Sequence, residues 1–209
     1  MDTHLIIQRS PEWYATKLGK VSSSRIADLM AKIKSGGSSA SRANYLAELA
    51  LERLTGVTQD GFESPAMVWG RETEPAARAA YCFENDVDVE EVGFIDHPTV
   101  PLTGCSPDGL VGATGLVEIK CPNPATHMET LLTKSIPQKY SLQMQFQMWV
   151  TGREFCDYVS FDPRFPVEMR YWQSHVQRHD ATIKTIAQEV ADFQADLDIK
   201  LRTLRDLYQ

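Results

Sequence analysis

Several segments of the chain place apolar residues three or four positions apart, which is the spacing of an amphipathic helix. The longest is the tail, where the pattern holds over about 180–208. In the segment 41–55 the pattern stops at Gly56, a residue that favours a helix end. We therefore predict helices from Ser23 or Ser24 onwards, at 41–55, 68–83 and 135–151, and at about 180–208.

A different pattern begins at Val87, where short stretches alternate polar and apolar residues between Gly and Pro. This period of two is typical of strands joined by tight turns. The predicted strands are 89–95, a piece near 102–103, 116–121 and 156–162. Helices and strands follow each other without a repeat or a Pro/Ser-rich linker. We therefore expect one α/β domain over 1–209, with a small mixed β-sheet flanked by helices.

The composition fits one soluble domain. The chain has 209 residues, of which 43% are hydrophobic and 23% are charged, and this is enough to build one core. The N-terminus lacks a basic stretch followed by an apolar one, and no apolar run reaches the ~18 residues that span a bilayer. We expect a cytoplasmic protein without membrane contact. The four cysteines are isolated from one another, so reduced thiols are expected rather than a zinc site.

Charge is distributed unevenly along the chain. The formal net charge of -7 argues against coating of nucleic acid through overall basicity. Residues 9–42 nevertheless hold seven Lys/Arg and two acids, whereas residues 60–118 hold twelve acids and two Arg. Chance segregation of solvated surface charge is one explanation. The other is a basic lip for an anionic substrate beside carboxylates that bind a divalent cation, a combination typical of metal-dependent phosphodiester chemistry.

The most informative stretch joins Ser106-Pro-Asp-Gly-Leu to Glu118-Ile-Lys, with nine residues between Asp108 and Glu118. Side chains of a strand alternate faces, so Glu118 and Lys120 project together while Ile119 points into the core. If the Pro-Asp-Gly turn ends a partner strand, Asp108 comes next to Glu118. The alternative is an ordinary turn beside a solvated strand face, and the spacing leaves both interpretations open.

Two carboxylates and the Ile119 carbonyl are hard oxygen ligands of the kind that Mg²⁺ accepts, with waters and a substrate phosphate completing the shell. Such an ion polarises the scissile phosphate, while Lys120 orients or helps to deprotonate an attacking water. Glu74 is a further candidate carboxylate, and its alternative role is that of an acid in the first turns of a helix. Gln145 is a candidate for holding a water or a phosphate near the metal, unless it lies on a polar helix surface.

Three ordered motifs resemble those of phage lambda-type exonucleases, the YqaJ-like viral recombinase group within the PD-(D/E)xK nuclease superfamily. They are Ser106-Pro-Asp-Gly-Leu, Glu118-Ile-Lys-Cys-Pro and Gln143-Met-Gln-Phe-Gln-Met-Trp-Val-Thr. The segments Trp13 to Gly19 and Trp69-Gly-Arg-Glu-Thr-Glu74 also resemble that group, so the similarity spans about 13–162. The resemblance implies a restriction-endonuclease-like core.

The resemblance also implies an activity, the 5′-to-3′ digestion of one strand of linear double-stranded DNA. The products are 5′ mononucleotides and 3′ overhangs for recombination by single-strand annealing. Two Mg²⁺ ions, replaceable by Mn²⁺, a ring-shaped homotrimer, a single-strand annealing protein as partner, and a phage or prophage origin in a bacterial host are implied as well. The alternatives are a structure-specific or restriction-type endonuclease of the same fold, and a non-catalytic DNA-end-binding protein.

Carried over position by position, the resemblance assigns a catalytic centre. Asp108 and Glu118 become metal ligands together with the Ile119 carbonyl. Lys120 becomes the lysine that handles water, and Glu74 the acid near the second metal.

The resemblance also places residues around the 5′ end of the DNA. Met67 falls where an apolar side chain wedges into the end of the duplex. Lys17 and Lys34 stand where the group has arginines that grip the terminal phosphate and the DNA, and lysine lacks the planar fork of arginine. Arg25 is a candidate to share that role. The other positions at which the group holds the 5′ phosphate are Ser24, Ser106 and Gln145.

Overall fold

The computed structural model describes residues 6–33, 37–59 and 63–208. Its larger sheet is built from β2 (Val89–Glu90), β5 (Gly109–Val111), β6 (Gly115–Lys120), β7 (Phe155–Phe161) and β8 (Tyr171–Gln177). The strands lie in the order β2-β5-β6-β7-β8. β6 and β7 run parallel, whereas the other neighbours run antiparallel. The structure therefore confirms the predicted α/β fold with a small mixed sheet flanked by helices.

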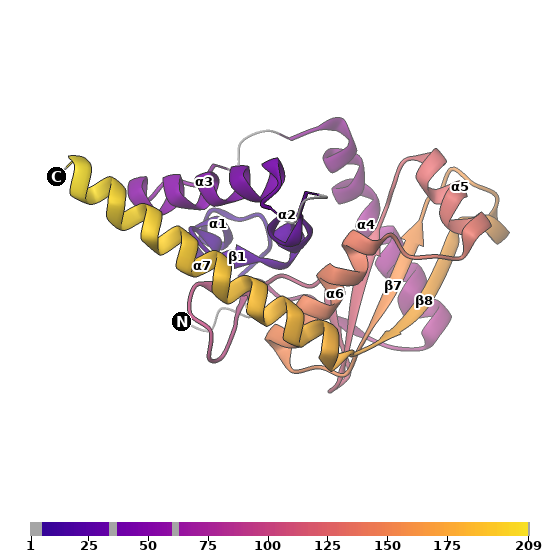
Figure 1. Ribbon diagram of the computed structural model, residues 1–209. Helices are drawn as coiled ribbons and strands as arrows, with labels where there is room; N and C mark the ends of the chain where they lie inside the picture. Colours follow the sequence, from indigo (N-terminus) through magenta and orange to yellow (C-terminus); the bar gives the residue numbers. More distant parts are fainter. Residues whose placement is uncertain (1–5, 34–36, 60–62, 209) are drawn as a thin grey trace.

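Two helices cover opposite faces of this sheet (Figure 1). They are α4 (Pro65–Asn85) and α6 (Gln138–Thr151). Successive residues of β6 and β7 point to opposite faces, so each strand contributes to both cores. The core on the α4 side comprises Ala77, Tyr81, Val117, Ile119, Val159 and Phe161, and the core on the α6 side comprises Leu116, Met144, Met148, Cys156 and Tyr158.

The N-terminal half forms a second layer. Its elements are α1 (Pro11–Lys17), β1 (Val21–Ser22), the 3₁₀ turn η2 (Ser23–Arg25), α2 (Ile26–Met30), α3 (Ala40–Thr55), β3 (Ile95–Asp96) and β4 (Thr103–Cys105). The strands pair in the order β1-β4-β3. α6 contributes Phe146 and Val150 to the core of this layer, so it packs against both parts of the molecule.

The predicted tail helix is α7 (Asp180–Tyr208), which packs against α6 and α2 and runs along α3 (Figure 1). It buries one apolar stripe, from Ile183 to Leu201. Like every other helix in the described ranges, it is not long and apolar enough to cross a membrane.

The structure differs from the predicted elements in a few places. The single strand predicted at 89–95 is wrong, because β2 and β3 belong to different sheets and the chain crosses between them with Val92 and Phe94 buried. The 3₁₀ turn η2 precedes α2, and neither has the expected serine side-chain cap. The elements absent from the prediction are α1, β1, β5, β8, the 3₁₀ turn η3 (Val167–Met169) and α5 (Pro124–Thr133).

Candidate active site

The hairpin of β5 and β6 gathers the candidate catalytic residues. Gly109 pairs with Val117, so Asp108, directly before β5, lies opposite Glu118. Asp108 Oδ2 accepts a hydrogen bond from the Ile119 backbone N–H at 2.7 Å. The turn therefore brings Asp108 to β6, but it precedes the partner strand β5 instead of ending a partner strand as expected. The alternative, a solvated strand face, is wrong because the side chain of Glu118 is fully buried.

Glu118 and Lys120 occupy the face of β6 that α6 covers, whereas Ile119 packs on the α4 side. The Lys120 ammonium forms an ion pair with Glu118 Oε1. Two α6 side chains donate to the same carboxylate: Gln143 Nε2 to Oε1 at 2.7 Å and Gln147 Nε2 to Oε2 at 2.6 Å. The buried carboxylate is thus held by three donors on two elements.

Negative charge accumulates at this centre. Burial and the neighbouring charge of Asp108 raise the pKa of Glu118 to about 7, against the opposing effects of Lys120 and Gln147. Burial and the charge of Asp108 also raise the pKa of Glu74. For Lys120, burial alone would lower the pKa, but the charges of Glu118 and Asp108 outweigh it and raise the pKa. The carboxylates therefore repel one another, and a cation between them would relieve that repulsion.

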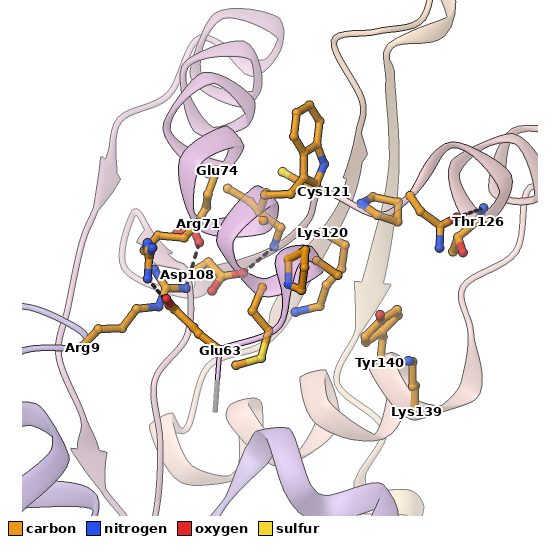
Figure 2. Close-up of a pocket in the computed structure, with 18 of the residues that line it drawn as sticks. Arg9, Glu63, Arg71, Glu74, Asp108, Lys120, Cys121, Thr126, Lys139 and Tyr140 are labelled. Carbon is orange, nitrogen blue, oxygen red and sulfur yellow. Dashed lines mark hydrogen bonds and ion pairs between the residues drawn. The ribbon is translucent and has the colours of Figure 1, made fainter. Parts of the chain in front are cut away.

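Glu74 reaches the same centre from α4, as predicted. Its Oε1 accepts from Arg78 Nη2 at 2.7 Å, and its Oε2 accepts from Arg9 Nη2 at 3.4 Å. Arg9 belongs to the segment before α1 and extends to Glu74 beside Asp108 (Figure 2). Two arginines therefore partly balance an acid whose charge is otherwise disfavoured.

An open cleft with a volume of about 1280 Å³ lies over these residues (Figure 2). Its wall includes aromatic rings with cations over them: Arg164 lies 4.0 Å from the Trp69 ring centroid, and Lys139 lies 4.7 Å from that of Tyr140. The charged residues that line it are Arg9, Lys17, Arg71, Lys120, Lys139 and Arg164, against Glu63, Glu74 and Asp108. The cleft therefore offers mainly basic walls around an acidic floor.

The residues of the floor fit a divalent cation. Within the described ranges no group of three His, Cys, Asp or Glu side chains could hold an ion by itself. Asp108 accepts a hydrogen bond from the Ile119 N–H and lies opposite Glu118 in the hairpin, so the two carboxylates and the Ile119 carbonyl are hard oxygen donors on neighbouring residues. With water or substrate oxygens completing the shell, this donor set matches Mg²⁺ or Mn²⁺.

A second, smaller cavity of about 200 Å³ lies beside the cleft, and Lys17 and Met67 line both. Ser24 and Arg25 complete its candidate phosphate-binding residues. Met67 is 57% exposed, which suits an apolar side chain that meets a ligand. The structure thus brings together four of the residues expected around the 5′ end.

The other residues expected at the 5′ end do not join this cavity. Ser106 accepts a hydrogen bond from Trp13 Nε1 at 2.8 Å. The expectation for Gln145 is wrong: its amide donates to the Gln177 carbonyl and accepts from the His179 N–H, each at 2.8 Å, at the start of α7. Lys34 lies outside the described residues.

Sequence reasoning missed Gln147 and Arg9 at the centre. Gln143 and Gln147 stand four residues apart, the spacing at which two side chains share a helix face, and this signal was available in the sequence. For Arg9 the sequence carried no comparable signal, because its contact with Glu74 joins residues 65 positions apart.

A mixed sheet whose hairpin brings an aspartate, a glutamate and a lysine together beside a basic cleft is the arrangement of the PD-(D/E)xK nuclease superfamily. The YqaJ-like viral recombinase domain matches residues 12–154. The chain belongs to this family, as its motifs indicated.

Solved structures agree with this assignment. An alkaline exonuclease (LHK-Exo) from Laribacter hongkongensis is 49% identical to the chain, with a TM-score of 0.88, and the match covers 94% of this chain and 97% of that one. The same enzyme in complex with dAMP matches over the same shares with a TM-score of 0.89. A phage related exonuclease from Haemophilus somnus 129PT shares the fold at 18% identity, with a TM-score of 0.71 over 88% of this chain and 96% of that one.

A curated viral protein is also similar. The uncharacterized protein R354 of Acanthamoeba polyphaga mimivirus is 31% identical over 103 residues, which are 43% of this chain. The match spans only 19% of the length of that protein.

Proposed function

We propose that this protein is a divalent-metal-dependent exonuclease that digests one strand of linear double-stranded DNA from its 5′ end, releasing 5′ mononucleotides and leaving 3′ overhangs. The observation that carries the proposal is the cluster of Asp108, Glu118 and Lys120, of which Asp108 and Lys120 line a basic cleft and Glu118 is buried beneath them. The 49% identity to an alkaline exonuclease over 94% of the chain supports the same reaction class.

In this proposal each residue of the centre has a separate task. Asp108, Glu118 and the Ile119 carbonyl hold the first of two Mg²⁺ ions, for which Mn²⁺ can substitute, and Glu74 lies near the second. Bound there, a divalent ion supplies a Lewis acid for the scissile phosphate and lowers the pKa of a water. Lys120, which is ion-paired with Glu118, orients the attacking water or helps to remove its proton.

The small cavity is the proposed seat of the 5′ phosphate. Lys17, Ser24 and Arg25 supply cationic and hydroxyl donors of the kind that bind phosphate oxygens. Met67 lines both cavities and is exposed, and its proposed role is to part the terminal base pair. Ser106 is retained in this role beside the cleft, whereas Gln145 is not.

We further propose the assembly that the family resemblance implies, a homotrimeric ring that encloses the duplex and passes the 3′ overhang to a single-strand annealing protein in the bacterial cytoplasm. A ring reconciles the net charge of -7 with DNA binding, because basic cleft walls can face the channel while the acidic surplus faces outward. Exposed Leu207 and Tyr208 at the end of α7 offer apolar area for contact between copies. A mass in solution of three chains tests this assembly.

The activity is tested by incubating supercoiled plasmid and end-labelled linear duplex with Mg²⁺. The proposal expects digestion of the linear form alone, with label at the 5′ end released first as mononucleotide. Cutting of the closed circle would instead indicate an endonuclease of the same fold. Binding of linear ends without any release would indicate a non-catalytic end-binding protein.

A further inference from the structure

Helix α6 presents two glutamines, one helical turn apart, to the buried carboxylate of Glu118. Gln143 Nε2 donates to Oε1 at 2.7 Å, and Gln147 Nε2 donates to Oε2 at 2.6 Å. We propose that Gln143 and Gln147 are positioning residues that fix Glu118 in the orientation in which it binds a divalent cation. This inference rests on the proposed function, since it takes Glu118 as a ligand of that cation.

The hydrogen bonds determine which oxygen of Glu118 is available. A carboxylate has about four lone-pair positions, two on each oxygen. Oε1 accepts from Gln143 and contacts the Lys120 ammonium, whereas Oε2 accepts from Gln147 alone. One position therefore remains, on Oε2, and we expect Glu118 to bind a cation through that single oxygen. Asp108 accepts from the Ile119 amide through Oδ2, which leaves further lone-pair positions on this carboxylate for a cation.

The carbonyl oxygen of the Gln147 amide shows that Glu118 determines how this amide is oriented. Gln147 is fully buried, and its Oε1 has no hydrogen-bond partner among the described residues. A buried carbonyl without a partner lowers stability, so hydrogen bonding within the core does not account for a glutamine here. Rotating the amide by half a turn would place its oxygen against the Glu118 carboxylate and remove the donor. The observed orientation gives the Glu118 carboxylate a donor and leaves the Gln147 amide oxygen without a hydrogen bond.

Neutral donors suit this task better than charged ones. An arginine or lysine in place of either glutamine would add a second cation beside Lys120 and would compete with a metal ion for Glu118. An amide orients the oxygen without that competition. Partners that orient a metal ligand in this way commonly change metal affinity about 10–100-fold when they are replaced.

The test is the binding of Mn²⁺, measured by calorimetry on the full chain without DNA. Gln147→Met keeps the length of the side chain but removes the donor, and we expect Mn²⁺ to bind roughly 10–100-fold more weakly. Gln143→Met is expected to weaken binding less, because Lys120 still holds Oε1. Excess Mn²⁺ should restore most DNA digestion in Gln147→Met, because the ligand itself is intact, and should restore none in Glu118→Ala.

Gln145→Met is the matched control. Gln145 lies on the same helix and is buried, but its amide bonds go to Gln177 and His179 instead of the centre. We expect this variant to unfold at a lower temperature and to bind Mn²⁺ as the wild type does. A loss of Mn²⁺ affinity equal to that of Gln147→Met would overturn the proposal, because it would reduce the effect to a general disturbance of α6.

Wild-type Mn²⁺ affinity in both Gln143→Met and Gln147→Met would also overturn the proposal. Gln143 is only partly buried, so its variant gives an answer even if Gln147→Met fails to fold. A wild-type chain that binds no Mn²⁺ removes the positioning role together with the metal site. Failure of the proposed function alone looks different: the wild type binds Mn²⁺, the glutamine variants bind it more weakly, and no DNA is digested.

Discussion

The β5–β6 hairpin and the small cavity of the N-terminal layer both hold candidate site residues, but they treat charge in opposite ways. At the hairpin, carboxylates share one centre, and the pKa values of Glu74 and Glu118 are both raised. At the small cavity, the principal cation already has partners. Arg25 Nε donates to Asp28 at 2.8 Å, and Arg25 Nη1 donates to both oxygens of Glu48 at 2.7 and 2.8 Å.

The hairpin gathers buried carboxylates of like charge, whereas at the small cavity the main cation is already paired within the chain. Burial and the charge of Asp108 raise the pKa of both Glu74 and Glu118, and a cation between these carboxylates would offset their charge. Arg25 is satisfied within the chain, and a phosphate must compete with Glu48 for it. The hairpin therefore supports its assignment more strongly than the small cavity does.

The largest effect is expected from Asp108→Asn. The asparagine oxygen can still accept from the Ile119 N–H, but the charge that binds the cation is lost. We expect nucleotide release to fall at least ~1000-fold. In the absence of metal, the variant should unfold at the same temperature as the wild type or higher, because a like charge beside Glu118 is gone. Strong digestion by this variant would contradict the comparison of the two sites, because the Asp108 charge at the hairpin would then not be needed for catalysis.

Metal binding should be visible as stability. At about 100 times its dissociation constant, Mg²⁺ or Mn²⁺ should stabilise the folded wild type by about 2.7 kcal/mol, and a chelator should reverse this. Thermal unfolding with and without the ion measures the effect. Asp108→Asn is the control and should lose most of the increase. Equal increases in both proteins would place the ion elsewhere on the molecule.

Lys17→Ala tests the small cavity. We expect the advantage of 5′-phosphorylated over 5′-hydroxyl ends to fall roughly ten-fold, the effect of one charge-assisted hydrogen bond. Rates on matched duplexes with the two kinds of end give the ratio. Lys139→Ala removes another lysine that lines the cleft but not the small cavity, and it should leave the ratio unchanged. A Lys17→Ala ratio equal to that of the wild type would exclude Lys17 from the phosphate site.

The smallest effect is expected from Glu48→Gln. This change weakens the internal partner of Arg25, so the preference for a 5′ phosphate should rise a few-fold if the two compete. The pair is partly exposed, and its loss should cost no more than about 1 kcal/mol of folding free energy. A lower preference for the phosphate would reverse the interpretation and make Glu48 the residue that orients Arg25.

The sequence predicted that Asp108, Glu118 and Lys120 could meet, although it left an ordinary turn open and did not predict β5, and two local rules account for the meeting. The period of two along β6 places Glu118 and Lys120 on one face, and the Pro-Asp-Gly turn places Asp108 opposite them. The tail helix was equally accessible, because its apolar stripe extends over 29 residues. Roles at the 5′ end came from family resemblance, since nothing local distinguishes Ser24 or Arg25 from surface residues.

The errors have physical reasons. Gln145 was misplaced because α6 is buried on nearly all sides from Met144 to Met148, so periodicity does not tell which glutamine faces the sheet. α5 was missed although Asn123 and Pro124 form a typical helix start, in which the asparagine side chain accepts from the Thr126 N–H. β8 was missed because an edge strand with partly exposed residues on both faces has little hydrophobic alternation.

The burial of α6 on both sides also has a consequence for how this protein tolerates change. Phe146 and Val150 face the N-terminal layer, Met144 and Met148 face the larger sheet, and Gln143 and Gln147 hold Glu118. Nearly every position is constrained from a different direction. In a saturation library selected for a functional enzyme, α6 should therefore accept few replacements, whereas the solvent face of α7 should accept many.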